Sequence, residues 1–532
     1  MRIDTYKFSE VDYFSKLIAD YTSGQLDTQI KPPYSLGLEG IKEQLKSEYP
    51  LFIDREELAS SIHQQYESIE VSSVVRSNID ALKEQTTFTV VTAHQLSTFG
   101  GPLYYVIKIA NTIAFSRKLK AEFPKYNFVP VYWMGSEDHD FDEINHIYLF
   151  GNKITWESTQ EGPVGRFSLE GIQEAVQQVL EILGDNCPDN LDRIVKKAYA
   201  HKTPQLATRE LVNSLFGKYG LVIVDGDDVS LKKAMSKVIK EELFTQPSYL
   251  LLLKRSSLLE ETGYHAQATG REVNLFLLGD DFRTRIEPHE SGFDINGEFW
   301  SQKRILKELD EHPENFSPNV ILRPLFQQGV LPNVAFIGGG GEIAYWLQLT
   351  DIFQHYNVRY PVLIPRTSLM FINFNQHKRL RKLNLSVVDL FKEKEELKKE
   401  FLVRKEDEIP DLEKEKASIA LIMEEIQAKA KDLDKTLVPS VGADGQRIQN
   451  TLNQIEGKML RSIKQRNKIE LNQIDGLFQA FFPDNSLQER HDNFMNFYSR
   501  YGKHFIDWLV QYLAVIEQEF VVITETEKLS LH

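Results

Sequence analysis

Residues 128–146 read FVPVYWMGSEDHDFDEINH, an apolar run that ends in closely spaced carboxylates and imidazoles. Such side chains serve as general acids and bases, and they also coordinate metals. In an open α/β sheet, ligands bind beyond the carboxyl ends of the strands. The run therefore predicts a buried strand that leads into a catalytic site. Its candidate catalytic residues are Glu137, Asp138, His139, Asp140, Glu143 and His146, with Asn145 as a candidate ligand contact.

Two glycine-rich turns are candidate anion sites. AHQLSTFGGP (residues 93–102) and IGGGGE (residues 337–342) each lie between a predicted strand and a predicted helix. Backbone N–H groups at a helix start can bind a phosphate or carboxylate, and glycine allows close approach. The chain has neither a P-loop sequence nor a well-placed G-x-G-x-x-G. The candidate binding residues here are His94, Gln95, Gly100, Gly101, Gly338, Gly339, Gly340, Gly341 and Glu342.

Two aromatic residues and two arginines extend this set. Tyr345 and Trp346 could stack on a base or sugar, or belong to the core. Arg323 and Arg366 each lie beside a proline near a predicted strand end, where a guanidinium can bind a carboxylate or phosphate in bidentate fashion. An ordinary ion pair is the alternative for each arginine.

A metal site is the competing interpretation of the acidic cluster. Asp138, His139 and His146 could form part of one, as in metal-dependent phosphohydrolases. No second histidine cluster with ligand spacing occurs, since His265 and His289 are isolated in the sequence. We therefore expect no tightly bound transition metal.

Composition narrows the class of protein. A formal net charge of -15 disfavours nucleic-acid binding but allows a local basic pocket for one anionic ligand. The single cysteine, Cys187, cannot form an intramolecular disulfide, and we interpret it as an incidental thiol. A chain without disulfides is typical of the reducing cytoplasm. No apolar run is long enough to span a bilayer, so we expect no membrane association.

Hydrophobic periodicity predicts the main elements. Strands at residues 88–92 and 128–134 flank a helix at 103–119, which makes a βαβ unit with parallel strands. Residues 1–85 are predicted to be mainly helical. Further strands are predicted at residues 221–224, 320–322, 334–337 and 362–364.

The later part of the chain predicts long helices. Leu412, Ile419, Ile426 and Leu433 recur every seven residues, and a second apolar pattern runs over residues 448–463 after the predicted turn LVPSVGADGQR. These helices either pack on the globular body or project as an antiparallel coiled coil that dimerises, and their length favours projection. The aromatic residues of the final segment should pack back on the body.

Several long motifs resemble the bacillithiol biosynthesis cysteine-adding enzymes, a family of cysteine ligases. They are VVTAHQLSTFGGPLYYVIK, FVPVYWMGSEDHDFDEINH, SPNVILRPLFQQGVLPNVAFIGGGGEIAYWLQL, PVLIPRTSL and LQERHDNFMNFYSRYG. The resemblance implies an α/β fold with a Rossmann-like, nucleotidyl-transferase-type core, inserted connecting-peptide segments and a C-terminal α-helical coiled coil that forms a homodimer. It also implies addition of cysteine to glucosaminyl-malate. Where this family carries Gly-Gln-Gln, the chain has Ala93, His94 and Gln95, which puts a role for His94 in doubt.

The resulting expectations are specific. We expect N-terminal helices and half of the core in residues 1–150, inserted segments in 151–315, the second half of the core in 316–380, the coiled coil in 381–480 and a packing segment in 481–532. A class I nucleotide fold suggests ATP, with or without Mg²⁺, as the agent that converts the cysteine carboxyl into an adenylate or acyl phosphate. An acid from residues 137–143 would deprotonate the attacking amine, and Arg323 or Arg366 would neutralise malate or phosphate. The alternatives are a metal-dependent amide or phosphoester hydrolase and a non-catalytic protein that binds a thiol precursor.

Overall fold

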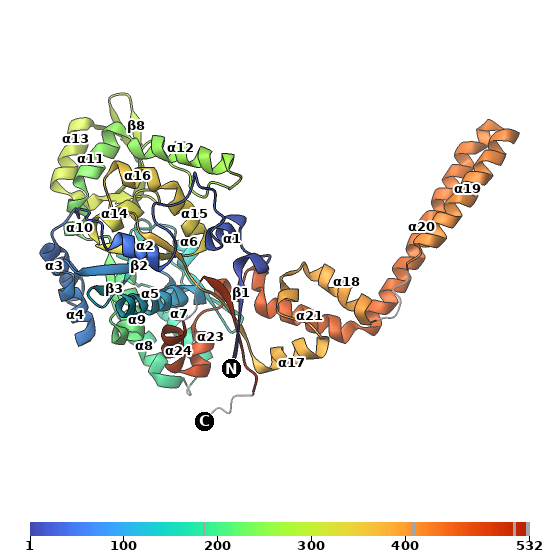
Figure 1. Ribbon diagram of the computed structural model, residues 1–532, viewed down its shortest axis with the longest axis horizontal. Coiled ribbons are helices and arrows are strands. Elements are labelled where there is room, and N and C mark those ends of the chain that lie inside the picture. The colour runs from blue at the N-terminus through green and yellow to red at the C-terminus, as the bar shows by residue number, and fades with distance from the viewer. Residues whose placement is uncertain (185–186, 406–410, 514–517, 528–532) are drawn as a thin grey trace. The chain divides into compact units, whose positions relative to one another are not determined.

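A computed structural model describes residues 1–184, 187–405, 411–513 and 518–527 (Figure 1). The chain forms two compact units. The core unit comprises Ile3–Phe371 and Leu487–Ile523, and the helical unit comprises Met1–Arg2, Ile372–Ser486 and Thr524–His532. In the described part of the chain, no helix has both the length and the apolar character needed to cross a membrane.

A five-stranded parallel sheet forms the centre of the core unit. Its order is β13-β12-β2-β3-β6, and all four strand pairs are parallel. The strands are β2 (Thr87–Gln95), β3 (Asn127–Gly135), β6 (Val222–Asp225), β12 (Asn333–Gly338) and β13 (Val362–Pro365). Their largely apolar, β-branched sequences suit a sheet that is covered on both faces. The strands predicted at residues 88–92, 128–134, 221–224, 334–337 and 362–364 are confirmed.

The strand order defines a topological switch point. From β2 the chain first adds β3 and β6 on one side, and then adds β12 and β13 on the other. In Figure 1, α5 (Leu103–Glu122) and α9 (Pro204–Phe216) lie on one side of β2 and β3, and α14 (Arg323–Val330) and α15 (Gly340–Gln348) on the other. Ligands in such sheets bind at the crevice where the order reverses, here between the ends of β2 and β12. The predicted crossover helix is confirmed as α5.

An antiparallel sheet is inserted between β6 and β12. Its order is β10-β9-β8-β7-β11. The strands are β7 (Leu275–Leu278), β8 (Arg283–His289), β9 (Gly292–Ile295), β10 (Glu298–Ser301) and β11 (Phe316–Pro318). The strand predicted at residues 320–322 is wrong, because the Asn319 side chain accepts hydrogen bonds from the N–H groups of Ile321 and Leu322 and turns the chain into α14.

The N-terminal region is mainly helical, as predicted. It contains α1 (Lys16–Thr22), α2 (Leu38–Gln44), α3 (Arg55–Gln65) and α4 (Ser73–Ala81). Ser15, Asp54 and Ser72 cap three of these helices through their side chains, which satisfies a free N–H in each first turn. The unpredicted strand β1 (Arg2–Lys7) pairs in a small sheet of order β1-β15-β14 with β15 (Glu519–Thr524) and β14 (Ser368–Ile372).

The other elements of the core unit complete its layers. A β-hairpin, β4 (His146–Leu149) and β5 (Asn152–Thr155), follows the acidic motif. The final aromatic segment packs on the core unit, as predicted, since α24 (His504–Tyr512) contacts α5. Residues 514–517 and 528–532 of the predicted packing segment lie outside the described residues. The remaining helices are α6 (Phe141–Ile144), α7 (Ile172–Leu183), α8 (Leu191–Ala198), α10 (Val229–Ala234), α11 (Ser236–Thr245), α12 (Pro247–Glu261), α13 (Gln302–Glu311), α16 (Thr350–His355), α22 (Gln488–His491), α23 (Met495–Tyr501) and α24 (His504–Tyr512).

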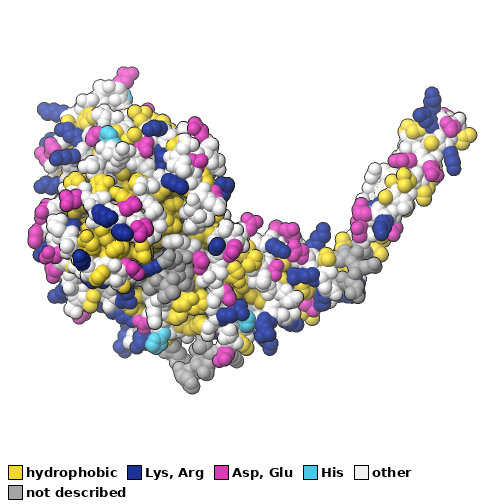
Figure 2. Space-filling model, viewed as in Figure 1, with side chains coloured by type: hydrophobic (Ala, Val, Ile, Leu, Met, Phe, Trp, Pro, Cys, Tyr) yellow, Lys and Arg dark blue, Asp and Glu magenta, His cyan; other side chains and the backbone are white. Residues whose placement is uncertain are grey.

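The helical unit contains the predicted coiled coil. Helices α19 (Glu413–Leu433) and α20 (Val438–Arg466) run side by side as a long hairpin (Figure 1), and α17 (Phe374–Leu383), α18 (Lys394–Lys405) and α21 (Lys468–Phe481) precede and follow it. Hydrophobic side chains are interspersed with charged ones along the hairpin (Figure 2). Among them, Leu421, Ile422 and Leu433 are 63%, 54% and 84% exposed.

The turn of the hairpin lies earlier than predicted. We expected residues 437–447 to form it, but the chain reverses at Lys435–Leu437 and α20 begins at Val438. Pro439 is tolerated because it falls in the first helical turn. Gly445 of α20 faces Met423 of α19, since a Cβ there would lie 3.4 Å from the Met423 Cε atom, in ordinary van der Waals contact.

Candidate functional site

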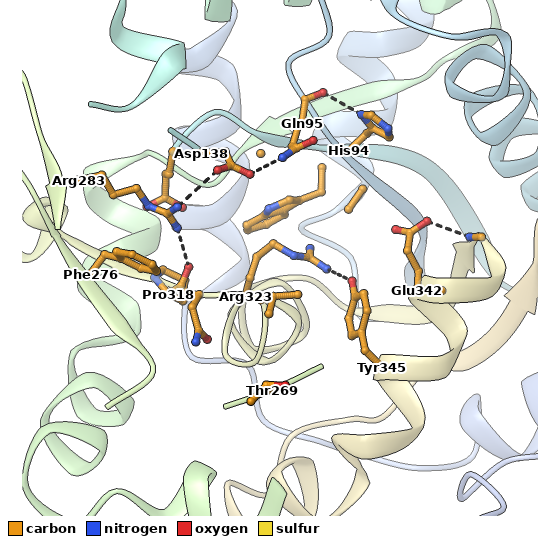
Figure 3. Close-up of a pocket in the computed structure, with 18 of the residues that line it drawn as sticks. His94, Gln95, Asp138, Thr269, Phe276, Arg283, Pro318, Arg323, Glu342 and Tyr345 are labelled. Carbon is orange, nitrogen blue, oxygen red and sulfur yellow. Dashed lines mark hydrogen bonds and ion pairs between the residues drawn. The ribbon is translucent and has the colours of Figure 1, made fainter. Parts of the chain in front are cut away.

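A cavity of about 650 Å³ opens where β2 and β12 end, and we name it the switch-point cavity (Figure 3). It is enclosed by the ends of the parallel strands, the start of α15, strands of the inserted sheet and the C-terminal segment. Its position matches the crevice expected from the strand order. The lining residues that sequence reasoning singled out are His94, Gln95, Glu137, Asp138, Arg323, Gly339, Gly341, Glu342, Tyr345 and Arg366.

The cavity carries positive charge in an acidic protein. Seven basic and three acidic side chains line it, whereas the whole chain has a net charge of -15. Among the described residues, the guanidinium groups of Arg271, Arg285 and Arg490 form no hydrogen bond or ion pair with the chain. A cleft with one sign of charge concentrates ligands of the opposite sign. The basic lining residues are Lys108, Arg271, Arg283, Arg285, Arg323, Arg366 and Arg490.

Asp138 is the centre of a polar cluster at the end of β3. Its carboxylate accepts hydrogen bonds from the Gln95 side chain and the His139 N–H, and it lies 3.5 Å from Arg283 Nη1 (Figure 3). Burial opposes ionisation, but the hydrogen bonds from His139 and Gln95 and the charge of Arg283 hold the pKa of Asp138 below its usual value. A carboxylate of this kind is a weak base, so it is better suited to orienting its neighbours than to taking a proton.

His94 lines the cavity as a neutral imidazole. Its Nδ1–H donates to the Gln95 carbonyl at 3.0 Å, so Nε2 accepts a hydrogen bond from the Tyr104 hydroxyl at 2.9 Å. Burial, together with the charge of Lys108, lowers the pKa of His94 to about 4. In the structure, His94 holds Tyr104 in the cavity wall.

The pKa of His94 predicts a pH dependence of stability. The unfolded chain protonates His94 near pH 6.5 and the folded chain near pH 4, so the unfolded state binds more protons between these values. The contribution of neutral His94 to the free energy of unfolding should therefore be fully present above pH 6.5 and be lost as the pH falls to 4. Urea unfolding measures the free energy of unfolding at pH 7 and at pH 4.5. The decrease between the two pH values should be smaller for His94→Gln than for the parent chain, by at most about 3 kcal/mol. Equal losses would contradict this assignment.

The chain itself occupies the helix start predicted to bind a ligand after β12. The Glu342 carboxylate accepts the Gly339 N–H at 2.8 Å and pairs with Lys108 Nζ at 2.7 Å. Lys108, which is only 2% exposed, also donates to the Ala93 carbonyl at 2.6 Å. Although burial opposes it, the charge of Lys108 lowers the pKa of Glu342. The Gly339 N–H, predicted as a contact for an anion, is therefore bound by Glu342.

The other glycine turn is closed by the C-terminal segment. Asn493 Nδ2 donates to the carbonyls of Phe99 and Gly101 at 3.1 and 2.6 Å, and a Cβ on Gly100 would lie 3.0 Å from the Phe494 ring. Gly100 and Gly101 have φ of 75° and 57°, so glycine is needed here for backbone geometry. Neither lines the cavity, so the structure places this predicted anion contact outside it.

Several predicted residues lie elsewhere. Trp346 is fully buried against Phe336, Phe353 and Tyr360, so of its two alternatives the structure supports a core residue over a ligand contact. His146 bonds its neighbour Asn145 at 2.9 Å. The predicted site residues that do not line the switch-point cavity are Gly100, Gly101, His139, Asp140, Glu143, Asn145, His146, Gly338, Gly340 and Trp346.

A buried network of ion pairs contacts the cavity through Glu137, the one member of the network that the sequence predicted as a site residue. Lys232, 1% exposed, lies 2.7 Å from both Glu137 Oε1 and Asp227 Oδ1. Arg166 donates to both oxygens of Asp227 at 2.7 and 2.8 Å. Burial raises the pKa of the neighbouring Asp225 to about 6, with the charge of Asp227 adding to the effect. Asp225 ends β6 and Asp227 follows it closely in the sequence, but Arg166 is distant along the chain.

The fold and the site define a class of protein: a Rossmann-like enzyme whose anion-attracting cavity lies at the switch point of its sheet. Comparison with known families narrows this class. The profile for "Bacillithiol biosynthesis BshC, N-terminal Rossmann-like domain" matches residues 1–367, and that for the "C-terminal coiled-coil domain" of BshC matches residues 369–525.

Curated relatives match over nearly the whole chain. A protein of Flavobacterium johnsoniae is 38% identical over 531 residues, covering 98% of this chain and all of the relative. One of Flavobacterium psychrophilum is 37% identical over 98% of this chain and 99% of its own, and one of Chlorobaculum tepidum 30% over 88% and 89%. Each of the three is named "Putative cysteine ligase BshC". The chain belongs to the BshC family of bacillithiol biosynthesis, as the sequence motifs indicated.

Proposed function

We propose that this chain joins cysteine to glucosaminyl-malate through an amide bond, after activation of the cysteine carboxyl by ATP. The observation that supports the proposal best is the positively charged switch-point cavity in a chain of net charge -15. The malate group of the acceptor carries two carboxylates, which arginines bind through charge-assisted hydrogen bonds. The family assignment supplies the ligase chemistry.

The lining residues divide into binding and orienting groups. Arg323 is half-buried, and its Nη2 donates to the Tyr345 hydroxyl at 3.1 Å, which fixes the guanidinium in the cavity wall (Figure 3). In our proposal Arg323 binds a malate carboxylate. Asp138 stays ionised and orients Arg283 and Gln95. Glu137, the other acid of residues 137–143 that lines the cavity, is the candidate acceptor for a proton of the attacking ammonium through Oε2, since its Oε1 pairs with Lys232 at 2.7 Å.

The basic lining of the cavity would also attract the phosphates of a nucleotide. A Cβ on Gly341 would have no neighbour closer than 3.9 Å, so the backbone there is open to a ligand. Because Glu342 already holds the Gly339 N–H, we assign the phosphates of ATP, with Mg²⁺ as their counter-ion, to Arg271, Arg490 and the Gly341 backbone. When bound, ATP would supply the carboxyl activation that amide formation in water requires.

The alternative of a metal-dependent hydrolase requires ligand atoms that converge on one metal ion. Across residues 1–184, 187–405, 411–513 and 518–527, one group of three or more His, Cys, Asp or Glu side chains brings its ligand atoms within 4.8 Å of one another. That group is Asp411, Glu413 and Glu456, in the helical unit. Asp138, His139 and His146 do not converge in this way, so nothing in their arrangement supports the hydrolase.

The proposal predicts a defined product. Incubation of the chain with cysteine, glucosaminyl-malate and ATP should give a species whose mass equals the sum of the two substrates minus water, together with AMP or ADP. Mass spectrometry measures both, and omission of ATP is the control. Product formation without ATP would contradict carboxyl activation by ATP and would indicate another activated donor. Absence of product with cysteine, glucosaminyl-malate and ATP together would contradict the proposed function.

We also propose that the chain acts in the cytoplasm as a homodimer joined through α19 and α20. Both helices expose large apolar side chains, including Leu421, Ile422, Ile455 and Met459. Burial of such side chains against a second copy would remove them from water, which stabilises a dimer.

A further inference from the structure

A second cavity of about 370 Å³, which we name the flank cavity, lies beside the switch-point cavity and shares a wall with it. Phe276, Arg283 and Arg285 line both. The shared wall places the flank cavity next to the proposed reaction site. Its full lining is His139, Phe276, Arg283, Thr284, Arg285, Glu287, Asp294, Asn296 and Gly297.

One face of the inserted sheet carries both signs of charge into this cavity. Arg285 and Glu287 are two residues apart on β8, so they share a face, and Ile286 between them is buried on the other. Glu287 lies directly opposite Asp294 of β9. Arg285 lies opposite Phe276 of β7. The face thus presents a cationic end beside the switch-point cavity and an anionic end away from it.

At the anionic end, the exposed carboxylates of Glu287 and Asp294 form no ion pair with any residue that the structure describes. Two carboxylates directly opposite each other on adjacent strands repel, which destabilises the pair. Asp294 Oδ1 accepts the Gly297 N–H at 3.0 Å. Within the described ranges, the Glu287 carboxylate has no hydrogen bond or ion pair at all. A bound cation between Glu287 and Asp294 would relieve the repulsion.

The cationic end has donors to spare. The Arg283 side chain is 9% exposed and stacks over the Phe276 ring at 4.0 Å, while Nη1 donates to His139 Nδ1 at 3.0 Å. Its buried Nε–H has no hydrogen-bond partner in the described structure. Arg285, which is exposed, has only a distant contact with the same ring. Arg283 Nη2 also donates to Ser317 Oγ and the Pro318 carbonyl, both at 3.4 Å. A carboxylate at the shared wall would therefore accept hydrogen bonds from Arg285, with the charge of Arg283 beside it.

We propose that the flank cavity binds the zwitterion of a free α-amino acid, and, resting on the proposed function, that this amino acid is the substrate cysteine. The carboxylate lies against Arg283 and Arg285, and the ammonium lies between Glu287 and Asp294. This orientation points the carboxyl group towards the switch-point cavity, where it is to be activated. Paired carboxylates favour the charged ammonium, which keeps the amine of cysteine from competing with the amine of the acceptor.

Binding measurements on the full chain test the site without requiring turnover. Calorimetric titration under reducing conditions should show that L-cysteine binds roughly tenfold or more tightly than cysteamine, which lacks the carboxylate, and 3-mercaptopropionate, which lacks the ammonium. Glu287→Gln and Asp294→Asn should each weaken L-cysteine binding by a similar factor. Glu290→Gln, which removes an exposed acid of the same hairpin outside the cavity, is the matched control and should bind as the parent chain does.

Unchanged L-cysteine affinity in folded Glu287→Gln and Asp294→Asn, or equal binding of the three compounds, would overturn the proposal. Arg285→Gln tests the carboxylate end independently, should either acidic variant fail to fold. In a turnover assay, the acidic variants should raise KM for cysteine and leave KM for glucosaminyl-malate unchanged. If the parent chain makes no amide product, the proposed function fails, yet the calorimetric comparison still decides whether the flank cavity is an amino-acid site.

Discussion

Arg366→Gln should destabilise the core unit by about 3–5 kcal/mol, because it leaves a buried charge without its partner. Arg366 donates to both oxygens of Glu489, at 3.0 and 2.7 Å, and the two side chains are 6% and 0% exposed. Ser368 and the Leu369 N–H also bind Glu489, but neither is a cation. Urea unfolding followed by fluorescence of the core unit measures the loss.

Two further variants separate charge from packing. Arg366→Gln combined with Glu489→Gln removes both charges and should recover part of the lost stability. Arg76→Gln changes an exposed arginine with no ion-pair partner in the described structure, and its stability should be unaltered. A single Arg366→Gln variant as stable as the parent chain would show that the ion pair with Glu489 is not structural.

Arg323→Gln should instead weaken substrate binding and leave stability almost unchanged. Arg323 is half-buried in the cavity wall, and its partners are the neutral groups Gln327 and Tyr345, so no carboxylate of the chain loses its counter-ion. A charge-assisted hydrogen bond to a malate carboxylate is worth enough to raise KM for glucosaminyl-malate roughly 10- to 100-fold. Steady-state kinetics with varied acceptor measures the effect.

Arg323→Lys keeps the charge but loses the planar fork, so it should fall between the parent chain and Arg323→Gln. Wild-type KM values in both variants would exclude Arg323 from acceptor binding. A fall in stability as large as that of Arg366→Gln would assign Arg323 a structural role. The two arginines were equivalent in the sequence, and their partners in the folded chain separate them.

Local patterns predicted most of the parallel sheet. The strands β2 and β3 and the helix α5 follow one another with clear hydrophobic periodicity, and their order implied a βαβ unit. Residues 320–322 have the composition of a strand but form a turn, because the Asn319 side chain competes for their N–H groups. Propensity alone does not reveal such a competition.

Contacts between distant residues limited the prediction of the site. Gly100 and Gly339 precede α5 and α15 in sequences that suggest anion binding. However, Asn493 closes the first turn, and Glu342, paired with Lys108, binds the second. Asn493 is almost four hundred residues from the loop that it binds. The cavity arginines Arg271 and Arg285 come from the inserted region, where no motif marks them. Arg490 lies in the motif LQERHDNFMNFYSRYG, but nothing in that motif alone indicates that its side chain reaches the cavity.

A crystal structure of the full chain with glucosaminyl-malate tests the central claim most directly, namely that the acceptor binds at the switch point of the parallel sheet. We expect electron density for the malate carboxylates beside Arg323, with the amine of the sugar facing the shared wall formed by Phe276 and Arg283. Ordered acceptor at another surface, with the switch-point cavity filled only by solvent, would contradict it.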